Sequence, residues 1–375
     1  LVDRAFSRDE LLRHAENPKY PAFQRDGRLT REAVEYLAQL FDDAHADELS
    51  GIGLQDFLFG AHGIWLASEV RAIEAQQIGL RELTGADGRS LARLSLEIVG
   101  SDMPFLVDSV MGEINAQGLN AVAMFHPIVT CQRDAEGKRV PGGAETRESY
   151  IWVHLDPLDA ARRTALLRGV EATLADVRAA VADFPAMQAR LREATRELQN
   201  ATTPAPPSEQ AECVDFLTWL TDRFTFLGVR EQSYPRGPDG KLVEGDPVVA
   251  PHSGLGVLRN LERGILRRGT VPTPITAAIG AFLDEPQSLI VTKSNLKSRV
   301  HRRVYADYIG VKRYDPNGQV IGETRFVGLF TAESYNCLVR DIPLLRRKAA
   351  RVLERAGKIP GSHSAKALQN IVDTY

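Results

Sequence analysis

The order of hydrophobic patterns between residues 89 and 200 most constrains what this chain can fold into. In the first stretch apolar residues alternate with polar ones, as in a half-buried strand, and they are Leu94, Leu96 and Ile98. Residues 104–117 then have apolar side chains at helical spacing, 120–134 and 148–156 have strand patterns, and 158–184 carry one long apolar stripe. Strand, helix, strand, strand, helix is the order of a split β-α-β unit, with an antiparallel sheet and helices on one face.

The residues on either side of this unit have patterns of their own. Residues 1–85 are predicted to be a helical segment, and residues 86–200 then form the β/α unit with its long helix. Residues 201–210, ATTPAPPSEQ, hold three prolines and are predicted to be a stiff linker between domains. Residues 211–375 show several strand patterns, a DPNG hairpin turn and two C-terminal helices. We therefore expect a multidomain α+β protein whose last domain is a mostly antiparallel sheet with flanking helices.

Composition argues against several classes of protein. A formal net charge of −3 gives no overall reason to expect a nucleic-acid or membrane partner, and no run approaches the ~18 apolar residues of a membrane helix. The three cysteines are far apart and lack nearby histidines at ligand spacing, which favours inert thiols in a reducing cytoplasm over a zinc site or disulfides. The chain begins with Leu1 and has no signal-peptide pattern, so we expect a piece of a longer protein.

The common catalytic motifs are missing from the sequence. The stretches GIGLQD and GLGVLR lack the third glycine and the strand-to-helix context of a dinucleotide site. There is no P-loop, HExxH or GxSxG motif, and no two carboxylates stand out as an acid and base pair. The residues therefore predict no catalytic, cofactor-binding or metal-binding site in this segment.

One basic cluster stands out, in the stretch KSNLKSRVHRR. It contains no acid, and its cationic residues are Lys293, Lys297, Arg299, Arg302 and Arg303. The functional interpretation is an anion site or an interface patch. The alternative is a solvated loop, which the shortness of the cluster and the negative net charge favour. Nucleic-acid binding is not expected.

The stretch GSDMPFLVDSV, residues 100–110, joins the first strand of the β/α unit to its first helix. Asp102 and Pro104 suit the start of a helix. Phe105 stands where a ligand-binding turn would often have glycine, which lets a ligand approach the backbone closely. The turn is therefore either a ligand pocket or a packed structural junction.

Two blocks resemble the N-terminal region of the large bacterial NAD-specific glutamate dehydrogenases. They are SDMPFLVDSVMGEINAQGLNAVAMFHPIV and a longer block that starts VTKSNLKSRVHRRVYADYIGVKRYDPNGQVIGETRFVGLFT. The resemblance covers most of residues 90–160 and 214–375. It implies an ACT-like (ferredoxin-like) unit followed by a PAS- or GAF-like sheet, with the dehydrogenase domain far downstream. It also implies that the parent enzyme uses NAD to deaminate L-glutamate to 2-oxoglutarate, in the cytoplasm and as a homo-oligomer.

The same resemblance makes this segment a non-catalytic regulatory and assembly region, whose partners are its own catalytic domain and other subunits. In regulatory ACT domains an amino-acid effector often binds near the turn from strand to helix. The usual motif there resembles D-x-P-G, and Phe105 departs from it in the last position. The candidate effector-binding residues are Ser101, Asp102, Met103, Pro104 and Asn120, with the backbone N–H groups of the helix start available to a carboxylate. The alternative is a purely structural assembly segment that binds no small molecule.

Overall fold

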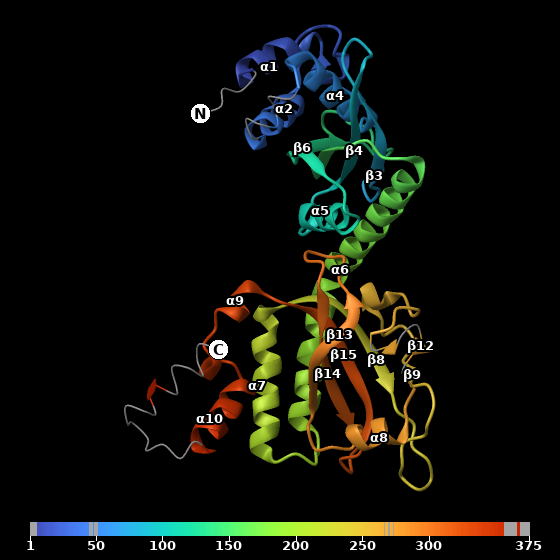
Figure 1. The fold of residues 1–375 in the computed structure, drawn as a ribbon, viewed down its shortest axis with the longest axis vertical. Helices are drawn as coiled ribbons and strands as arrows, with labels where there is room; N and C mark the ends of the chain where they lie inside the picture. Colours follow the sequence, from blue (N-terminus) through green and yellow to red (C-terminus); the bar gives the residue numbers. More distant parts are fainter. Residues whose placement is uncertain are drawn as a thin grey trace. The chain divides into compact units, whose positions relative to one another are not determined.

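The computed structural model describes residues 6–44, 48, 52–265, 267–268, 271–272, 274–355 and 366–367. These residues form two compact units, each with its own sheet (Figure 1). Each unit also has its own hydrophobic core. The first unit ends at Val177 and also includes His301–Arg303. The second comprises Arg178–Val300 and the described residues from Val304 onward.

An antiparallel sheet forms the centre of the first unit, in the order β3-β4-β7-β5, with β6 also paired to β7. β7 lies between β4 and β5 and is antiparallel to both, and α5 connects β4 to β5. The predicted split β-α-β arrangement is therefore confirmed. The elements are β3 (Gln77–Thr84), β4 (Ser90–Ser101), α5 (Leu106–Ala116), β5 (Ala121–Phe125), β6 (Ile128–Arg133), β7 (Ala144–Leu155) and α6 (Ala160–Asn200).

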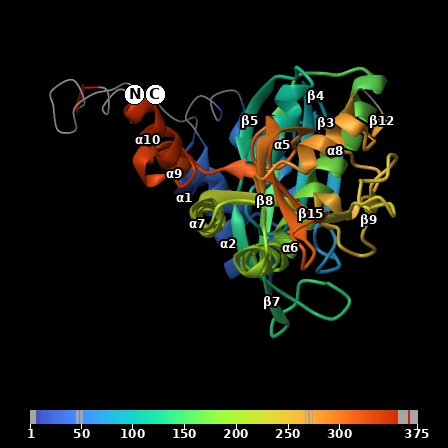
Figure 2. The ribbon, with the colours of Figure 1, turned by 90° about the horizontal axis from the view of Figure 1, so that it is seen from below.

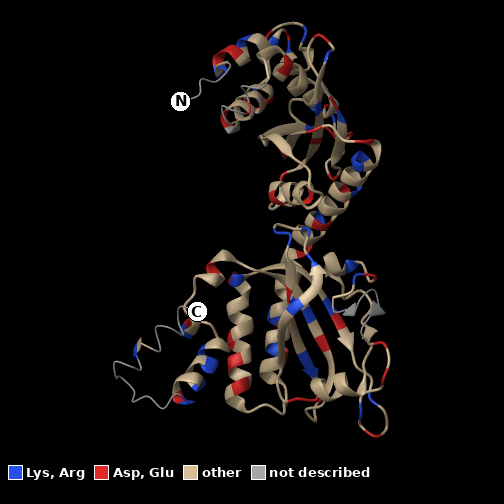
Figure 3. Ribbon diagram, in the orientation of Figure 1, with Lys and Arg blue, Asp and Glu red and all other residues tan. Residues whose placement is uncertain are grey.

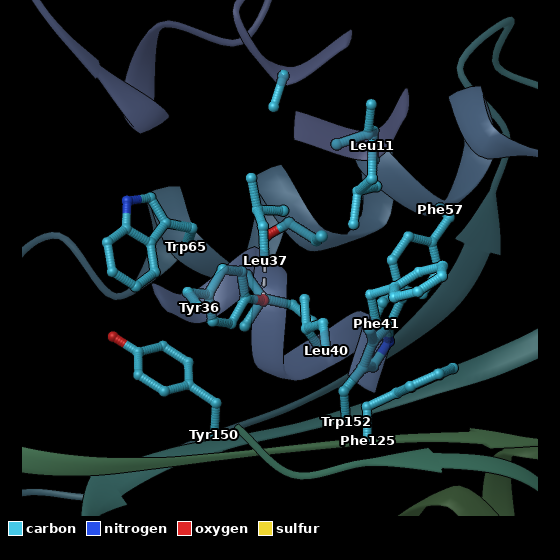
Figure 4. Close-up of a cluster of buried hydrophobic side chains, with 14 of the residues drawn as sticks. Leu11, Tyr36, Leu37, Leu40, Phe41, Phe57, Trp65, Phe125, Tyr150 and Trp152 are labelled. Carbon is cyan, nitrogen blue, oxygen red and sulfur yellow. Dashed lines mark hydrogen bonds between the residues drawn. The ribbon is translucent and has the colours of Figure 1, made fainter. Parts of the chain in front are cut away.

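The N-terminal helices pack on the sheet of the first unit, which corrects the expectation that one face is free of helices. Their apolar side chains form a single core with Phe125, Tyr150 and Trp152 of the sheet (Figure 4). Gly60 allows α4 to approach closely, because a Cβ at this position would lie 2.7 Å from the Trp152 ring. Residues 94–100 of β4 are consequently buried on both faces, whereas the alternating pattern predicted a half-buried strand. The helices are α1 (Arg8–Ala15), α2 (Arg31–Asp43) and α4 (Leu54–Ala67).

The N-terminal segment is helical over a shorter stretch than the predicted residues 1–85. Ser7 and Glu10 form the capping box expected at the first helix. Residues 77–84, however, form the edge strand β3, which pairs with β4. An edge strand buries few side chains, and here even Ile78 and Leu80 are only half-buried, so the apolar pattern is weak in the sequence.

A second antiparallel sheet, in the order β10-β8-β15-β14-β13 with β9 paired to β8, is the frame of the second unit. α7 and the C-terminal half of α6 pack on one of its faces, and Figure 2 shows them nearly end-on. The predicted hairpin joins β14 to β15, with Gly318 at φ +82° in its turn. The elements are α7 (Pro207–Arg223), β8 (Phe224–Ser233), β9 (Val248–Val249), β10 (Leu255–Gly256), β13 (Leu289–Lys297), β14 (Tyr305–Tyr314) and β15 (Val320–Phe330).

The shorter elements lie around these two sheets. In the first unit they are β1 (Gln24–Arg25) and β2 (Arg28–Leu29). In the second unit they are β11 (Arg267–Arg268), β12 (Val271–Pro272), α8 (Ala277–Leu283), α9 (Ala332–Tyr335) and α10 (Leu345–Arg355). No helix in the described parts of the chain is long and apolar enough to span a membrane. The helix predicted over residues 364–375 lies almost entirely outside the described residues.

The proline-rich stretch at residues 201–210 is a turn within the second unit, not the boundary between domains that the sequence predicts. Met187 and Leu191 of α6 share a core with Cys213 and Phe216 of α7, so the helices on either side of the turn pack together. The division between the units falls after Val177, inside the continuous helix α6. A helix that passes from one core to another carries no proline-rich break, which is why composition points to the wrong place.

Candidate functional site

The polar side chains of the turn between β4 and α5 form hydrogen bonds and an ion pair within the first unit. Ser101 Oγ donates a hydrogen bond to the Ile73 carbonyl at 3.0 Å. The backbone N–H of Asp102 donates to the Arg147 carbonyl at 2.9 Å, and its carboxylate forms an ion pair with Arg147 Nε at 2.9 Å. Asp102 therefore has an ion-pair partner on β7, and the N-cap side chain, Phe105, makes no capping hydrogen bond to α5.

Phe105 occupies the N-cap position of α5 in the left-handed conformation, at φ +72°. An L-residue with a side chain adopts this region at a cost of roughly 1–2 kcal/mol, whereas glycine adopts it readily. The backbone thus has the shape that glycine would favour, although the residue is phenylalanine. Its half-buried ring lies 5.2 Å from the imidazole of His301, which is counted with this unit. Met103 and Pro104 precede the N-cap, so Pro104 lies just outside the first helical turn that the sequence predicts for it.

Asn120 lies apart from the other candidate effector residues. Ser101 pairs with Glu148 on β7, whereas Ala121, next to Asn120, pairs with Leu155. Seven residues of extended strand separate these two positions, or about 23 Å. Asn120 Nδ2 donates instead to Asp156 Oδ2 at 3.0 Å. The structure therefore brings together residues 101–104 but places Asn120 at the opposite end of the sheet.

The cations of the basic cluster in residues 293–303 are spread over a strand and a loop, and most of them have partners. Lys293 forms an ion pair with Asp307 on the adjacent strand at 2.6 Å, and Arg303 forms one with the buried Glu113 of α5. Arg299 and Arg302 each have an interaction within the described structure. Lys297 is exposed on β13. Two of the five cations, Lys293 and Arg303, are therefore neutralised by ion pairs.

Comparisons with known proteins match both parts of the chain. The family model for the glutamate dehydrogenase ACT1 domain matches residues 36–170, and that for glutamate dehydrogenase helical motif 1 matches residues 342–375. An NAD-specific glutamate dehydrogenase of Halomonas elongata is 37% identical over 300 residues, and one of Pseudomonas aeruginosa is 35% identical over 288 residues. The chain belongs to the N-terminal region of the NAD-specific glutamate dehydrogenase family.

These matches cover most of the chain but a small part of each relative. The two alignments span 75% and 74% of this chain, and 18% and 17% of the relatives. An NAD-specific glutamate dehydrogenase of Mycobacterium tuberculosis is 28% identical over 75% of this chain and 16% of its own length. A solved RNA-binding light-oxygen-voltage receptor aligns at 12% identity over 86% of this chain and 93% of its own, with a TM-score of 0.15, too low to indicate a shared fold.

The ACT1 match places the turn at α5 inside the part of the chain that the glutamate dehydrogenase family model describes. Residues 36–170 contain all five strands of the first sheet and the turn that precedes α5. The second match begins just before α10, so this helix opens the family's first helical motif. The fold prediction is therefore confirmed at the level of a mixed α/β chain with antiparallel sheets and an ACT domain.

A buried ion cluster next to this sheet has no counterpart in the sequence predictions. Glu148 on β7 accepts hydrogen bonds from Arg133 on β6 and from Arg71 after α4, and all three side chains are fully buried. Burial alone would raise the pKa of Glu148, but the two guanidinium groups outweigh it and lower the pKa to about 2. The cluster ties the N-terminal helices to the sheet. Its members lie up to 77 residues apart, so only tertiary structure reveals it.

A second buried polar cluster lies on the sheet of the second unit, on the face opposite α6 and α7. Glu323 accepts hydrogen bonds from Tyr234 Oη at 2.5 Å, from Tyr308 Oη and from Arg325 Nε at 3.0 Å. Gly310 makes room for this carboxylate, because a Cβ there would overlap Glu323. The pKa values of both tyrosines are raised, first by burial and in part by Glu323. The cluster joins β14, β15 and the end of β8, and its members form hydrogen bonds with one another.

Neither cluster has the composition of a metal centre. No group of three His, Cys, Asp or Glu side chains that could hold a metal ion occurs among the described residues. Both clusters pair one carboxylate with arginine, and removal of one member of such a buried pair is strongly destabilising. We regard them as structural, and the turn at α5 lies within the ACT1 match.

Proposed function

We propose that this chain is a non-catalytic regulatory and assembly segment of a longer NAD-specific glutamate dehydrogenase. The parent would be a cytoplasmic homo-oligomeric oxidoreductase of glutamate catabolism, which converts L-glutamate, NAD and water to 2-oxoglutarate, ammonium and NADH. NAD would bind to the catalytic domain and not to this segment. The observation that carries the proposal is the ACT-type unit, whose split β-α-β sheet coincides with the ACT1 match. The partners of the segment would be its own catalytic domain and other subunits.

We also propose a PAS-like arrangement for the second unit. The strand order β10-β8-β15-β14-β13 supports this proposal, since it is the order expected of a PAS-like sheet. The helices that pack on one face agree with it. Superposition of the second unit on known PAS domains would test the arrangement directly.

If the segment is regulatory, the turn at residues 101–104 binds an amino-acid effector. The N-cap side chain, Phe105, makes no capping hydrogen bond, so the N–H groups at the start of α5 could donate to a carboxylate. Calorimetry of the chain against common L-amino acids should then give a saturable heat that Asp102→Ala weakens. Absence of heat with every amino acid, while the longer enzyme still responds to one, would remove the effector from this segment.

A specific observation favours a second candidate function, a purely structural assembly segment. Phe105 fills the position of the motif glycine, and Asp102 is already paired with Arg147. In this reading the turn is a packed junction, and the segment acts only through subunit contacts. Light scattering during size exclusion should show self-association of the chain. A strictly monomeric chain at high concentration would argue against it.

The absence of catalysis is tested separately. The chain alone should neither bind NAD nor reduce it in the presence of L-glutamate. Either activity in the isolated chain would overturn the non-catalytic assignment.

A further inference from the structure

A groove of about 760 Å³ lies in the second unit, between α7, β13 and α10. Most of the side chains that line it are apolar. Those from the two helices and the strand include Phe216, Trp219, Leu289, Val291 and Leu345. Val291 is 47% exposed and Leu345 is 40% exposed, so part of this apolar lining is open to solvent. A contiguous apolar surface of this kind marks a place where another group binds.

The acidic side chains that line the groove already have partners. Glu209 of α7 forms ion pairs with Arg347 and Arg351, and Glu212 forms one with Arg346. These charges hold α7 and α10 together. A charged ligand would have to compete with them, whereas an apolar group would bury the open part of the lining without disturbing any ion pair. The lining therefore favours an apolar occupant.

The sequence that follows α10 contains a segment of this kind. α10 ends at Arg355, and Gly357 and Pro360 then interrupt the helical pattern. Residues 368–375, which lie outside the described part of the chain, have apolar side chains at the i, i+3, i+4 and i+7 spacing of one helix face. These are Leu368, Ile371, Val372 and Tyr375. The match to glutamate dehydrogenase helical motif 1 covers this segment together with α10.

The connection to α10 brings residues 368–375 within reach of the groove. Arg351 lines the groove one helical turn before Arg355, and the chain from Arg355 to Leu368 spans up to about 40 Å when extended. A short tether also gives the segment an effective concentration in the millimolar range, far above that of a second copy in dilute solution. We propose that residues 368–375 dock in the groove through their apolar side chains. The proposal does not depend on whether the segment is regulatory.

Cys337 is a probe of access to the groove. It lines the groove and is half-buried, whereas Cys131 and Cys213 are buried. Burial raises the pKa of Cys131 to about 12 and that of Cys213 to about 11, so both remain protonated near neutral pH and react slowly with a maleimide. The rate of alkylation of the full chain therefore measures how often the groove is open.

The experiment compares two double variants that each add two carboxylates to the segment. Ile371→Asp with Val372→Asp places them on the apolar face, and Asn370→Asp with Thr374→Asp places them on the opposite side. We expect the first variant to speed alkylation of Cys337 by about tenfold or more, because a charge is costly in an apolar site. The second should leave the rate unchanged. Equal rates in the two variants would overturn the proposal.

A substitution in the groove tests the same contact from the other side. Val291→Asp should also speed alkylation of Cys337, whereas Thr292→Asp, on the opposite face of β13, should not. In a chain that already carries Ile371→Asp and Val372→Asp, Val291→Asp should add little, because the segment has been released. If Val291→Asp had its full effect there, the groove and the segment would be independent, contrary to the proposal.

Dilution separates the tethered segment from a second copy of the chain. Protection of Cys337 by the segment should be the same at every protein concentration, because the occupant belongs to the same molecule. Protection that is lost on dilution would place a second copy in the groove and contradict the proposal. Hydrogen exchange in β15 should be unchanged in every variant, which separates opening of the groove from loss of the fold.

Discussion

At the scale of single residues, Phe105 has a backbone conformation that its own side chain disfavours. Its φ of +72° favours glycine, so the usual ranking of alanine above glycine should reverse at this position. Phe105→Ala and Phe105→Gly lose the same ring, and we expect the glycine variant to be the more stable by about 0.5–1 kcal/mol. Urea unfolding followed by a probe in the first unit would measure the difference.

The control for this comparison is an exposed helical position in the same element. Asn115 lies within α5, where alanine should be more stable than glycine by about 1 kcal/mol. If alanine is also the more stable at Phe105, the left-handed conformation does not govern the turn, and the ring alone explains the residue.

Glu148 makes the stability of the first unit depend on pH. Its folded-state pKa of about 2 lies below the ordinary value, so its ionised form stabilises the folded state fully above about pH 5, and this contribution is lost as the pH falls toward 2. The loss should reach the order of 3 kcal/mol. Glu148→Gln should lower the free energy of unfolding by roughly 3–5 kcal/mol at neutral pH, because it leaves two buried arginines uncompensated. The free energy of unfolding of this variant should also fall less steeply between about pH 5 and pH 2.

Denaturant unfolding at a series of pH values would measure this dependence. Glu145→Gln removes an exposed glutamate of the same strand and serves as the control. If the free energy of unfolding fell equally steeply at low pH in the Glu148→Gln and Glu145→Gln variants, other carboxyl groups would be responsible for the pH dependence.

At the scale of elements, α10 is held mainly by charge. It buries only Ala349, whereas its arginines form ion pairs with acidic residues of α7: Arg346 with Glu212 and Asp215, and Arg347 and Arg351 with Glu209. Figure 3 shows the acidic residues along α7 and the basic ones along α10. Between the two helices and β13 lies a partly apolar groove of about 760 Å³, so tight apolar packing does not support α10.

High salt should therefore loosen α10 more than the rest of the second unit. The Debye length falls to about 3 Å at 1 M salt, and each exposed pair contributes roughly 0.2–1 kcal/mol. We expect hydrogen exchange in α10 to speed up by about tenfold or more between 0.1 and 1 M KCl, and amides of β15 to stay protected. Glu209→Gln should produce part of the effect at low salt. Equal protection of α10 at both salt concentrations would contradict an electrostatic attachment.

The elements also show where sequence reasoning succeeds and where it stops. The sequence predicts α5 from its helical spacing, β7 from its strand pattern and the β14–β15 hairpin from its DPNG turn. Periodicity misses β3, whose side chains are half-buried at a sheet edge. It also predicts that β4 is half-buried, because the helices that cover the second face of β4 come from a separate segment of the chain. The turn at 101–105 could be found from its residue types. The left-handed φ of Phe105 and the arginine partners of Glu148 could not, since both depend on tertiary structure.

At the scale of the whole molecule, the two units have separate cores although they share α6. The core around Trp152 and the core around Phe326 have no residue in common. Glu148 in the first unit and Glu323 in the second are both buried carboxylates in arginine-containing clusters. This correspondence allows each unit to be weakened in turn by the same change, glutamate to glutamine.

We expect the two substitutions to act on opposite parts of the chain. Glu148→Gln should speed hydrogen exchange in β4 and β7 and leave β14 and β15 unchanged, whereas Glu323→Gln should do the reverse, each by an amount corresponding to roughly 3–5 kcal/mol. Sites in separate cores with no shared partner should be nearly additive, so the double variant should show the sum of the two patterns. If either variant loosened both sheets equally, α6 would couple the units into one cooperative structure, and an effector bound to the first unit could then act on the second through that helix.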